Sequence, residues 1–269
     1  MRDWHKAIVY SCFWIISYIL LHLLAEKIKV PSAWYADDAS IILSLIVFAF
    51  LALTMTVAVA RFRFCWTLDI CAFIIALSLC LICTLLKIAM VGDGLLVICS
   101  LFFGRMLART IREPNILLPV GLVLIVVDVW TVALGPVGNA IEQAAQEPHS
   151  VVGKVTEAAT VQVPMAGYSG TNIIGLGDFV FMGLFFTVLQ RFSMNIRGSF
   201  LLCLILLVFG LLLVSGLNGL PLPGLPFLVV GVLVPNFRQL RFSQREWVYM
   251  AVAFTFLFGM LLIITKTFN

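Results

Sequence analysis

The sequence has few charged residues: only 11% of its 269 residues are Asp, Glu, Lys or Arg. A water-soluble domain carries about 25% charged residues, so composition excludes a soluble globular protein of this length. The mean hydropathy of +1.13 and the 62% hydrophobic content point the same way. A net charge of +4, scattered along the chain, gives no basis for nucleic-acid binding. The composition predicts an all-α polytopic membrane protein.

Motifs for metals, nucleotides and disulfide frameworks are also missing. All seven cysteines except Cys65 lie in apolar runs, and Cys80-x-x-Cys83 has no second ligand pair for zinc. No Walker or Rossmann fingerprint occurs, so we expect neither a metal nor a cofactor. Asp69 and Asp93 fall near the ends of apolar runs, where capping or solvation is the expected role.

Long apolar runs are what the sequence has in abundance. Most approach the ~20 residues that a helix needs to cross a bilayer, so they predict about nine transmembrane helices. The runs cover residues 7–24, 39–60, 68–91, 94–108, 115–135, 171–190, 199–218, 220–236 and 247–265.

The distribution of Lys and Arg tests this division. With nine spans, twelve of the 17 basic residues, including every arginine, fall on one side and five lysines on the other. The positive-inside rule then predicts a cytoplasmic N-terminus and an external C-terminus. The small size and the lack of extra domains favour a prokaryotic cytoplasmic membrane.

Two aspartates lie inside apolar runs. Asp128 is in the run 115–135, and Asp178 is in a helix expected to start near Thr171. At a helical rise of ~1.5 Å per residue, both carboxylates are expected roughly 10–12 Å below the outer boundary of the membrane, so they can face each other. A carboxylate in hydrocarbon is costly and marks a functional site by default. A facing pair shares one proton, so one member can activate a water molecule while the other polarises a carbonyl oxygen.

The residues around both aspartates resemble the presenilin and signal peptide peptidase superfamily of GxGD intramembrane aspartyl proteases. Gly175-Leu176-Gly177-Asp178, followed by an apolar stretch, is similar to the family's second catalytic helix, and Asp128 matches its first aspartate. Pro223-Gly224-Leu225-Pro226 resembles the Pro-Ala-Leu motif. The resemblance covers about residues 115–236, which gives N-terminal helices in 1–114, a catalytic core in 115–236 and a C-terminal helix in 237–269.

The chain departs from the family pattern at several points. Val127 stands where the family has Tyr, and Gly224 stands where the motif has Ala. Four helices precede the Asp128 helix where the family has five. The loop between the aspartates faces outside, as in signal peptide peptidase and opposite to presenilin.

The resemblance implies an endopeptidase that cleaves transmembrane segments of membrane proteins within the bilayer. Asp128 and Asp178 would be catalytic, and two groups of residues would shape the site and present backbone to the substrate: Gly175, Leu176 and Gly177, and Pro223, Gly224 and Leu225. The two glycines before Asp178 permit close approach of a substrate, although small-residue packing between helices is the common use of glycine in membranes. Alternation in Thr160–Val163 predicts either a strand that gates the site or pairs with substrate, or an external loop.

Three other interpretations remain open from sequence. A prepilin-peptidase-like enzyme also uses a GxGD aspartate, but its motif leads into a lysine-containing stretch that this chain lacks. A proton-coupled transporter or channel would use the two aspartates as a relay. A catalytically silent relative would bind transmembrane helices without cleaving them. The sequence does not specify the substrate or the oligomeric state.

Overall fold

The computed structural model describes residues 2–27, 34–62, 66–86, 88–133, 150, 160–163, 172–216, 222–240, 242–244, 247–248, 250–255 and 259. Helices dominate these residues, with one small sheet. The helices are α1 Arg2–Lys27, α2 Trp34–Arg61, α3 Trp66–Leu85, α4 Ala89–Ala108, α5 Leu117–Ala133, α8 Leu176–Arg191, α9 Ile196–Gly216 and α10 Leu225–Asn236, with short 3-10 turns η1 Pro114–Ile116 and η2 Phe237–Gln239. The strands are β1 Thr160–Val163 and β2 Asn172–Gly175.

Six of the described helices are long and apolar enough to cross a membrane. They are α1 to α4, α5 together with η1, and α9. Because the bilayer core offers no water to backbone groups, these apolar segments form helices that satisfy their own hydrogen bonds. The chain is an integral membrane protein. The runs 171–190 and 220–236 contain shorter helices, α8 and α10, and much of the run 247–265 lies outside the described residues.

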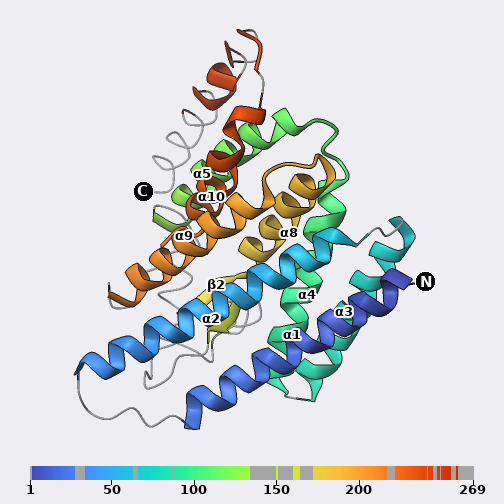
Figure 1. Cartoon of the computed structure of the whole chain (residues 1–269), viewed down its shortest axis with the longest axis vertical. Helices are drawn as coiled ribbons and strands as arrows, with labels where there is room; N and C mark the ends of the chain where they lie inside the picture. The colour runs from blue at the N-terminus through green and yellow to red at the C-terminus, as the bar shows by residue number, and fades with distance from the viewer. Residues whose placement is uncertain are drawn as a thin grey trace.

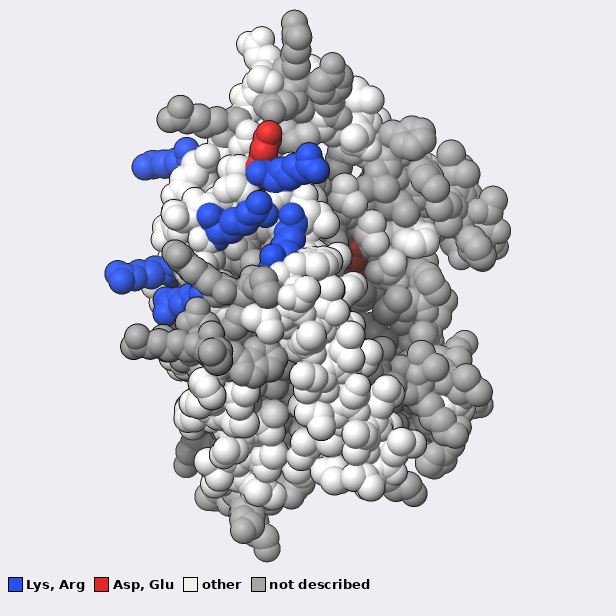
Figure 2. Space-filling model, turned by 90° about the vertical axis from the view of Figure 1, so that its right-hand side faces the viewer, with Lys and Arg blue, Asp and Glu red and all other residues white. Residues whose placement is uncertain are grey.

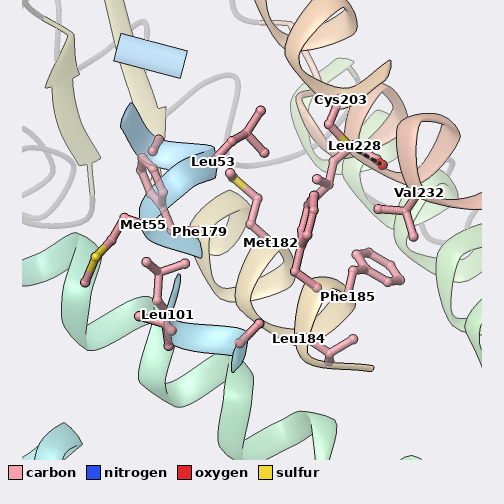
Figure 3. Close-up of a cluster of buried hydrophobic side chains, with 14 of the residues drawn as sticks. Leu53, Met55, Leu101, Phe179, Met182, Leu184, Phe185, Cys203, Leu228 and Val232 are labelled. Carbon is pink, nitrogen blue, oxygen red and sulfur yellow. Dashed lines mark hydrogen bonds between the residues drawn. The ribbon is translucent and has the colours of Figure 1, made fainter. Parts of the chain in front are cut away.

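Helix α8 lies in the middle of the molecule (Figure 1). It contacts α2 and α4 on one side and α9 and α10 on the other, while α5 packs on α10 and α3 packs on α4. The core therefore follows α8, where Phe179, Phe185 and Phe186 are fully buried. Figure 3 shows this arrangement, with α8 side chains between Leu53 and Leu101 on one side and those of α9 and α10 on the other.

Two glycines let α4 and α8 cross in backbone contact. A Cβ atom added to Gly183 of α8 would lie 2.6 Å from the carbonyl oxygen of Leu101, and one added to Gly104 of α4 would overlap the carbonyl oxygen of Val180. Neither position has room for a side chain. Close approach through small residues is how membrane helices gain packing energy, so this crossing fixes α8 against the rest of the bundle.

The two strands form an antiparallel hairpin that leads directly into α8. Thr160 pairs with Gly175 and Val163 pairs with Asn172. Of the two alternatives left open for Thr160–Val163, the structure has the strand, with Val161 and Val163 buried. The predicted helix start near Thr171 is wrong, because the chain is extended up to Gly175 and α8 begins at Leu176. A depth for Asp178 calculated along a helix from Thr171 therefore does not apply.

Asp69 is a buried ion-pair centre, which corrects the prediction of a capping or solvated residue. Its carboxylate is fully buried and bonds Arg105 Nε at 2.8 Å, and it also pairs with Arg109. Arg105 additionally donates to the carbonyl oxygens of Val59 and Phe62. The last carbonyls of α2 lack helical partners, so Arg105 completes the end of that helix. The cluster ties α2, α3 and α4 together.

Candidate active site

The first turn of α8 carries Asp178. Gly175, the last residue of β2, has an extended conformation with φ −66° and ψ 143°, and it occupies the position that precedes the helix. Leu176, Gly177 and Asp178 are the first three residues of α8. Unpaired N–H groups and the helix dipole favour negative charge in a first helical turn. The strand-to-helix junction thus places the Asp178 carboxylate at the N-terminus of α8.

The start of α10 holds Asp128. The Leu225 N–H donates a hydrogen bond to Asp128 Oδ2 at 2.9 Å, and Leu225 is the first residue of α10. Pro226 follows within the first turn, where a missing N–H has no cost. Asp128 itself lies on α5, which packs along α10. Both aspartates are therefore placed at helix N-termini, Asp178 on its own helix and Asp128 on a neighbouring one.

Gly224 links the two carboxylates. A Cβ atom at this glycine would lie 2.7 Å from Asp178 Oδ2, so the backbone of Gly224 runs directly beside that carboxylate. The next residue, Leu225, bonds Asp128 through its N–H. Two predicted aspartates and the Pro-Gly-Leu segment, far apart in sequence, meet at one dipeptide.

A cavity of about 80 Å³ opens beside this junction. One water needs roughly 10–15 Å³ on this measure, so the cavity has room for several. Asp178, Pro223 and Gly224 line one part of it, while Asp128 is not among its lining residues. The rest of the wall is apolar and comes from α2, β2, α8, α9, α10 and the segment just before α10: Phe48, Ala49, Ala52, Ile174, Phe179, Met182, Leu207, Gly210, Leu211, Val214, Leu222 and Phe227.

The predicted shaping glycines border open space. A Cβ atom added at Gly175 or at Gly177 meets nothing within 4 Å among the described residues, unlike one at Gly183. Helix packing therefore does not explain why glycine stands at these two positions. Leu176, in contrast, packs partly buried against the core cluster. The glycines leave an unobstructed backbone beside Asp178.

Sequence reasoning missed the part of the wall that α2 and α9 supply. Phe48, Ala49 and Ala52 line the cavity from α2, and Leu207 and Leu211 line it from α9. These residues are ordinary in an apolar helix, so no local pattern distinguishes them from lipid-facing positions. Only the packing of α2 and α9 on each other brings them to the site.

Comparisons of the chain with protein-family models, with curated proteins and with solved structures find no match. The chemistry of the site is therefore inferred from its own residues. Within the described part of the chain, no group of three or more His, Cys, Asp or Glu side chains is placed to hold a metal ion. The groups present are two carboxylates held beside adjacent residues, a backbone N–H that donates to one of them, and a cavity with room for several waters beside the other.

Proposed function

We propose that this protein is an intramembrane aspartic endopeptidase of the presenilin and signal peptide peptidase type. The observation that carries the proposal is the convergence of Asp128 and Asp178 on the Gly224-Leu225 dipeptide. The three sequence motifs that resemble the family thus meet in space as a catalytic site requires. A chance occurrence of the motifs would not favour such a meeting.

The two carboxylates would divide acid and base work. Like charges this close hold one proton between them, so one member is ionised and the other protonated. The ionised member takes a proton from a water whose oxygen attacks the peptide carbonyl carbon, and the protonated member gives its proton to the carbonyl oxygen. A proton then passes to the amide nitrogen as the C–N bond breaks. Asp178 borders the cavity that would hold this water.

The substrate would be an apolar segment of another membrane protein. Apolar side chains, from α2, α8, α9 and α10 among others, line most of the cavity, which suits hydrophobic residues near the scissile bond. A helical substrate hides its carbonyls in its own hydrogen bonds and must become extended before attack. β2 pairs with β1 along one edge and runs directly to Asp178, so an extended substrate would lie along β2 and past the open faces of Gly175 and Gly177.

The same proposal includes nine spans, with α8 and α10 as parts of membrane-crossing segments, a cytoplasmic N-terminus and a prokaryotic cytoplasmic membrane. Its support is the arginine distribution. Arg61 ends α2, Arg105 lies in the last turn of α4 and Arg191 ends α8, while Arg197 starts α9. Figure 2 shows basic side chains gathered in the upper half of one face, above a wide uncharged surface. Arginine at one end fits the positive-inside rule.

The experiment is cleavage of single-pass membrane substrates by the purified full chain in bilayers. Asp128→Asn and Asp178→Asn should abolish products, because an amide neither accepts the proton nor donates one in return. The matched control is Asp93→Asn, which makes the same change on α4, outside the candidate site. If either site variant cleaves like the wild type, the protease proposal fails. Proton flux measured in the same vesicles, lost with the same variants in the absence of any cleavage, would instead establish the transporter.

A further inference from the structure

A second, larger cavity lies at the other end of α8. Its volume is about 650 Å³, and four arginines line it: Arg61, Arg105, Arg109 and Arg191. Asp178 is in the first turn of α8 and Arg191 is its last residue. At a rise of about 1.5 Å per residue the two lie roughly 20 Å apart along the helix. This cavity, here named the arginine pocket, is separate from the aspartate site.

The arginine pocket carries excess positive charge. Asp69 pairs with both Arg105 and Arg109. Among the described residues that line the pocket or form ion pairs with its arginines, one carboxylate therefore stands against four guanidinium groups, which leaves 4 − 1 = 3 positive charges. Arg191 donates to the carbonyl oxygens of Arg109 and Ile111, which fixes its side chain but does not neutralise it. Excess charge in a hollow of fixed cations favours an anionic ligand.

Uncharged donors complete the arginine pocket. The hydroxyl of Thr187 is buried, has no hydrogen-bond partner among the described residues and belongs to a lining residue. Buried polar groups normally have partners, so an unpartnered one marks a place where a ligand or water belongs. Ser193 also lines the pocket and holds a left-handed conformation, φ 53°, which is costly for a residue other than glycine. Gln190 adds an amide to the same wall.

From these observations we propose that the arginine pocket binds a phosphate group. Phosphate oxygens accept hydrogen bonds from guanidinium groups and hydroxyls, and the pocket offers both. The three surplus positive charges also favour an anion that accepts several hydrogen bonds. The arginines lie at the ends of membrane helices, where lipid headgroups are found. The phosphate is therefore either that of an anionic lipid headgroup or free phosphate in solution. The site is independent of the proposed proteolysis.

The test measures binding by the purified full chain in a nonionic detergent. One arm titrates phosphatidylglycerol in mixed micelles and counts bound lipids by native mass spectrometry. The other arm adds inorganic phosphate and follows thermal unfolding. Arg61→Gln removes an exposed pocket cation, and Thr187→Val removes the unpartnered hydroxyl at nearly constant volume. The control is Arg238→Gln, which removes an exposed arginine beyond the end of α10, outside the pocket lining.

We expect binding to weaken roughly five- to tenfold in Arg61→Gln and severalfold in Thr187→Val, with Arg238→Gln unchanged. Retention of phosphatidylglycerol that inorganic phosphate does not displace identifies a headgroup site, and stabilisation by inorganic phosphate alone identifies a free-phosphate site. The proposal is overturned if neither ligand binds, or if Arg238→Gln weakens binding as much as Arg61→Gln. The latter result would mean that the basic end attracts anions without a built site.

Discussion

Gly177→Ala adds one methyl group that should lower the cleavage activity without lowering the stability of the protein. No described atom lies within 4 Å of the added Cβ, and Gly177 is inside the first turn of α8. Alanine is a better helix former than glycine by up to about 1 kcal/mol. We therefore expect the variant to be as stable as the wild type or slightly more stable. The methyl group would, however, occupy space that the substrate backbone needs beside Asp178.

The loss of activity follows from crowding. Forcing a methyl group into a closely packed contact costs about 1–3 kcal/mol, which is roughly a five- to 150-fold fall in kcat/KM. The assay pairs cleavage of a transmembrane substrate with thermal unfolding of the same preparation. Gly183→Ala provides the opposite pattern, because its Cβ would lie 2.6 Å from the Leu101 carbonyl oxygen and must push α4 and α8 apart. Gly183→Ala should therefore lower the stability of the protein, whereas Gly177→Ala should not.

Gly92→Ala is the matched control, since its Cβ would make only an ordinary contact of 3.9 Å with Cys83 on the far side of the bundle core. It should leave cleavage unchanged and, like Gly177→Ala, be as stable as the wild type or slightly more stable. Wild-type cleavage by Gly177→Ala would refute the idea that substrate passes this glycine. A large loss of stability in Gly177→Ala would contradict the presence of open space beside Gly177.

Three further variants test other contacts. Gly224→Ala would place a Cβ 2.7 Å from Asp178 Oδ2, so the carboxylate must turn and kcat/KM should fall at least about tenfold; faster cleavage would contradict this geometry. Asp69→Asn leaves the buried Arg105 without its counter-charge and should lower the free energy of unfolding by about 3 kcal/mol, as followed by denaturation in mixed micelles, and an unchanged midpoint would show that the ion pair is not needed. Asn236→Ala removes the buried amide that bonds the Ser199 hydroxyl at 2.7 Å, and a loss of about 2 kcal/mol by the same method is expected; full stability would mean that water replaces it.

The two aspartates could be singled out from the sequence because the signal that marks each of them is local. An acid inside an apolar run is rare enough to stand out, and Asp128 and Asp178 are the two that lie deep in such runs. Their shared dipeptide was suggested only through the resemblance at Pro223-Gly224-Leu225. No sequence rule gives the bond from Leu225 N–H to Asp128, which depends on how α5 packs on α10.

The start of α8 was misjudged because periodicity cannot separate a short buried strand from a helix. Ile173 and Ile174 are β-branched and favour the extended conformation that pairs with β1. The partner strand was visible in the alternation of Thr160–Val163, but its register with residues 172–175 was not. The signal available in the sequence was the pair of β-branched residues directly before Gly175-Leu176-Gly177, which indicates a short strand.

The sequence contains a signal for the ion-pair cluster at Asp69, although Asp69 itself was interpreted as a residue at a helix end. Arg105 and Arg109 are four residues apart, so they project from one face of a helix. Two cations on one face at the end of an apolar helix call for a buried acid nearby. The identity of that acid was beyond sequence, because it depends on α3 packing against α4.

The most direct measurement is a double-mutant cycle on the dyad. Cleavage rates of one transmembrane substrate are compared for the wild type, Asp128→Asn, Asp178→Asn and the double variant, each checked for folding by thermal unfolding. If the two carboxylates work as a unit on one water, each single change lowers the rate by about 10²–10⁴-fold and the double change lowers it no further. Losses that multiply, or a single variant that retains the wild-type rate, would contradict a shared catalytic site.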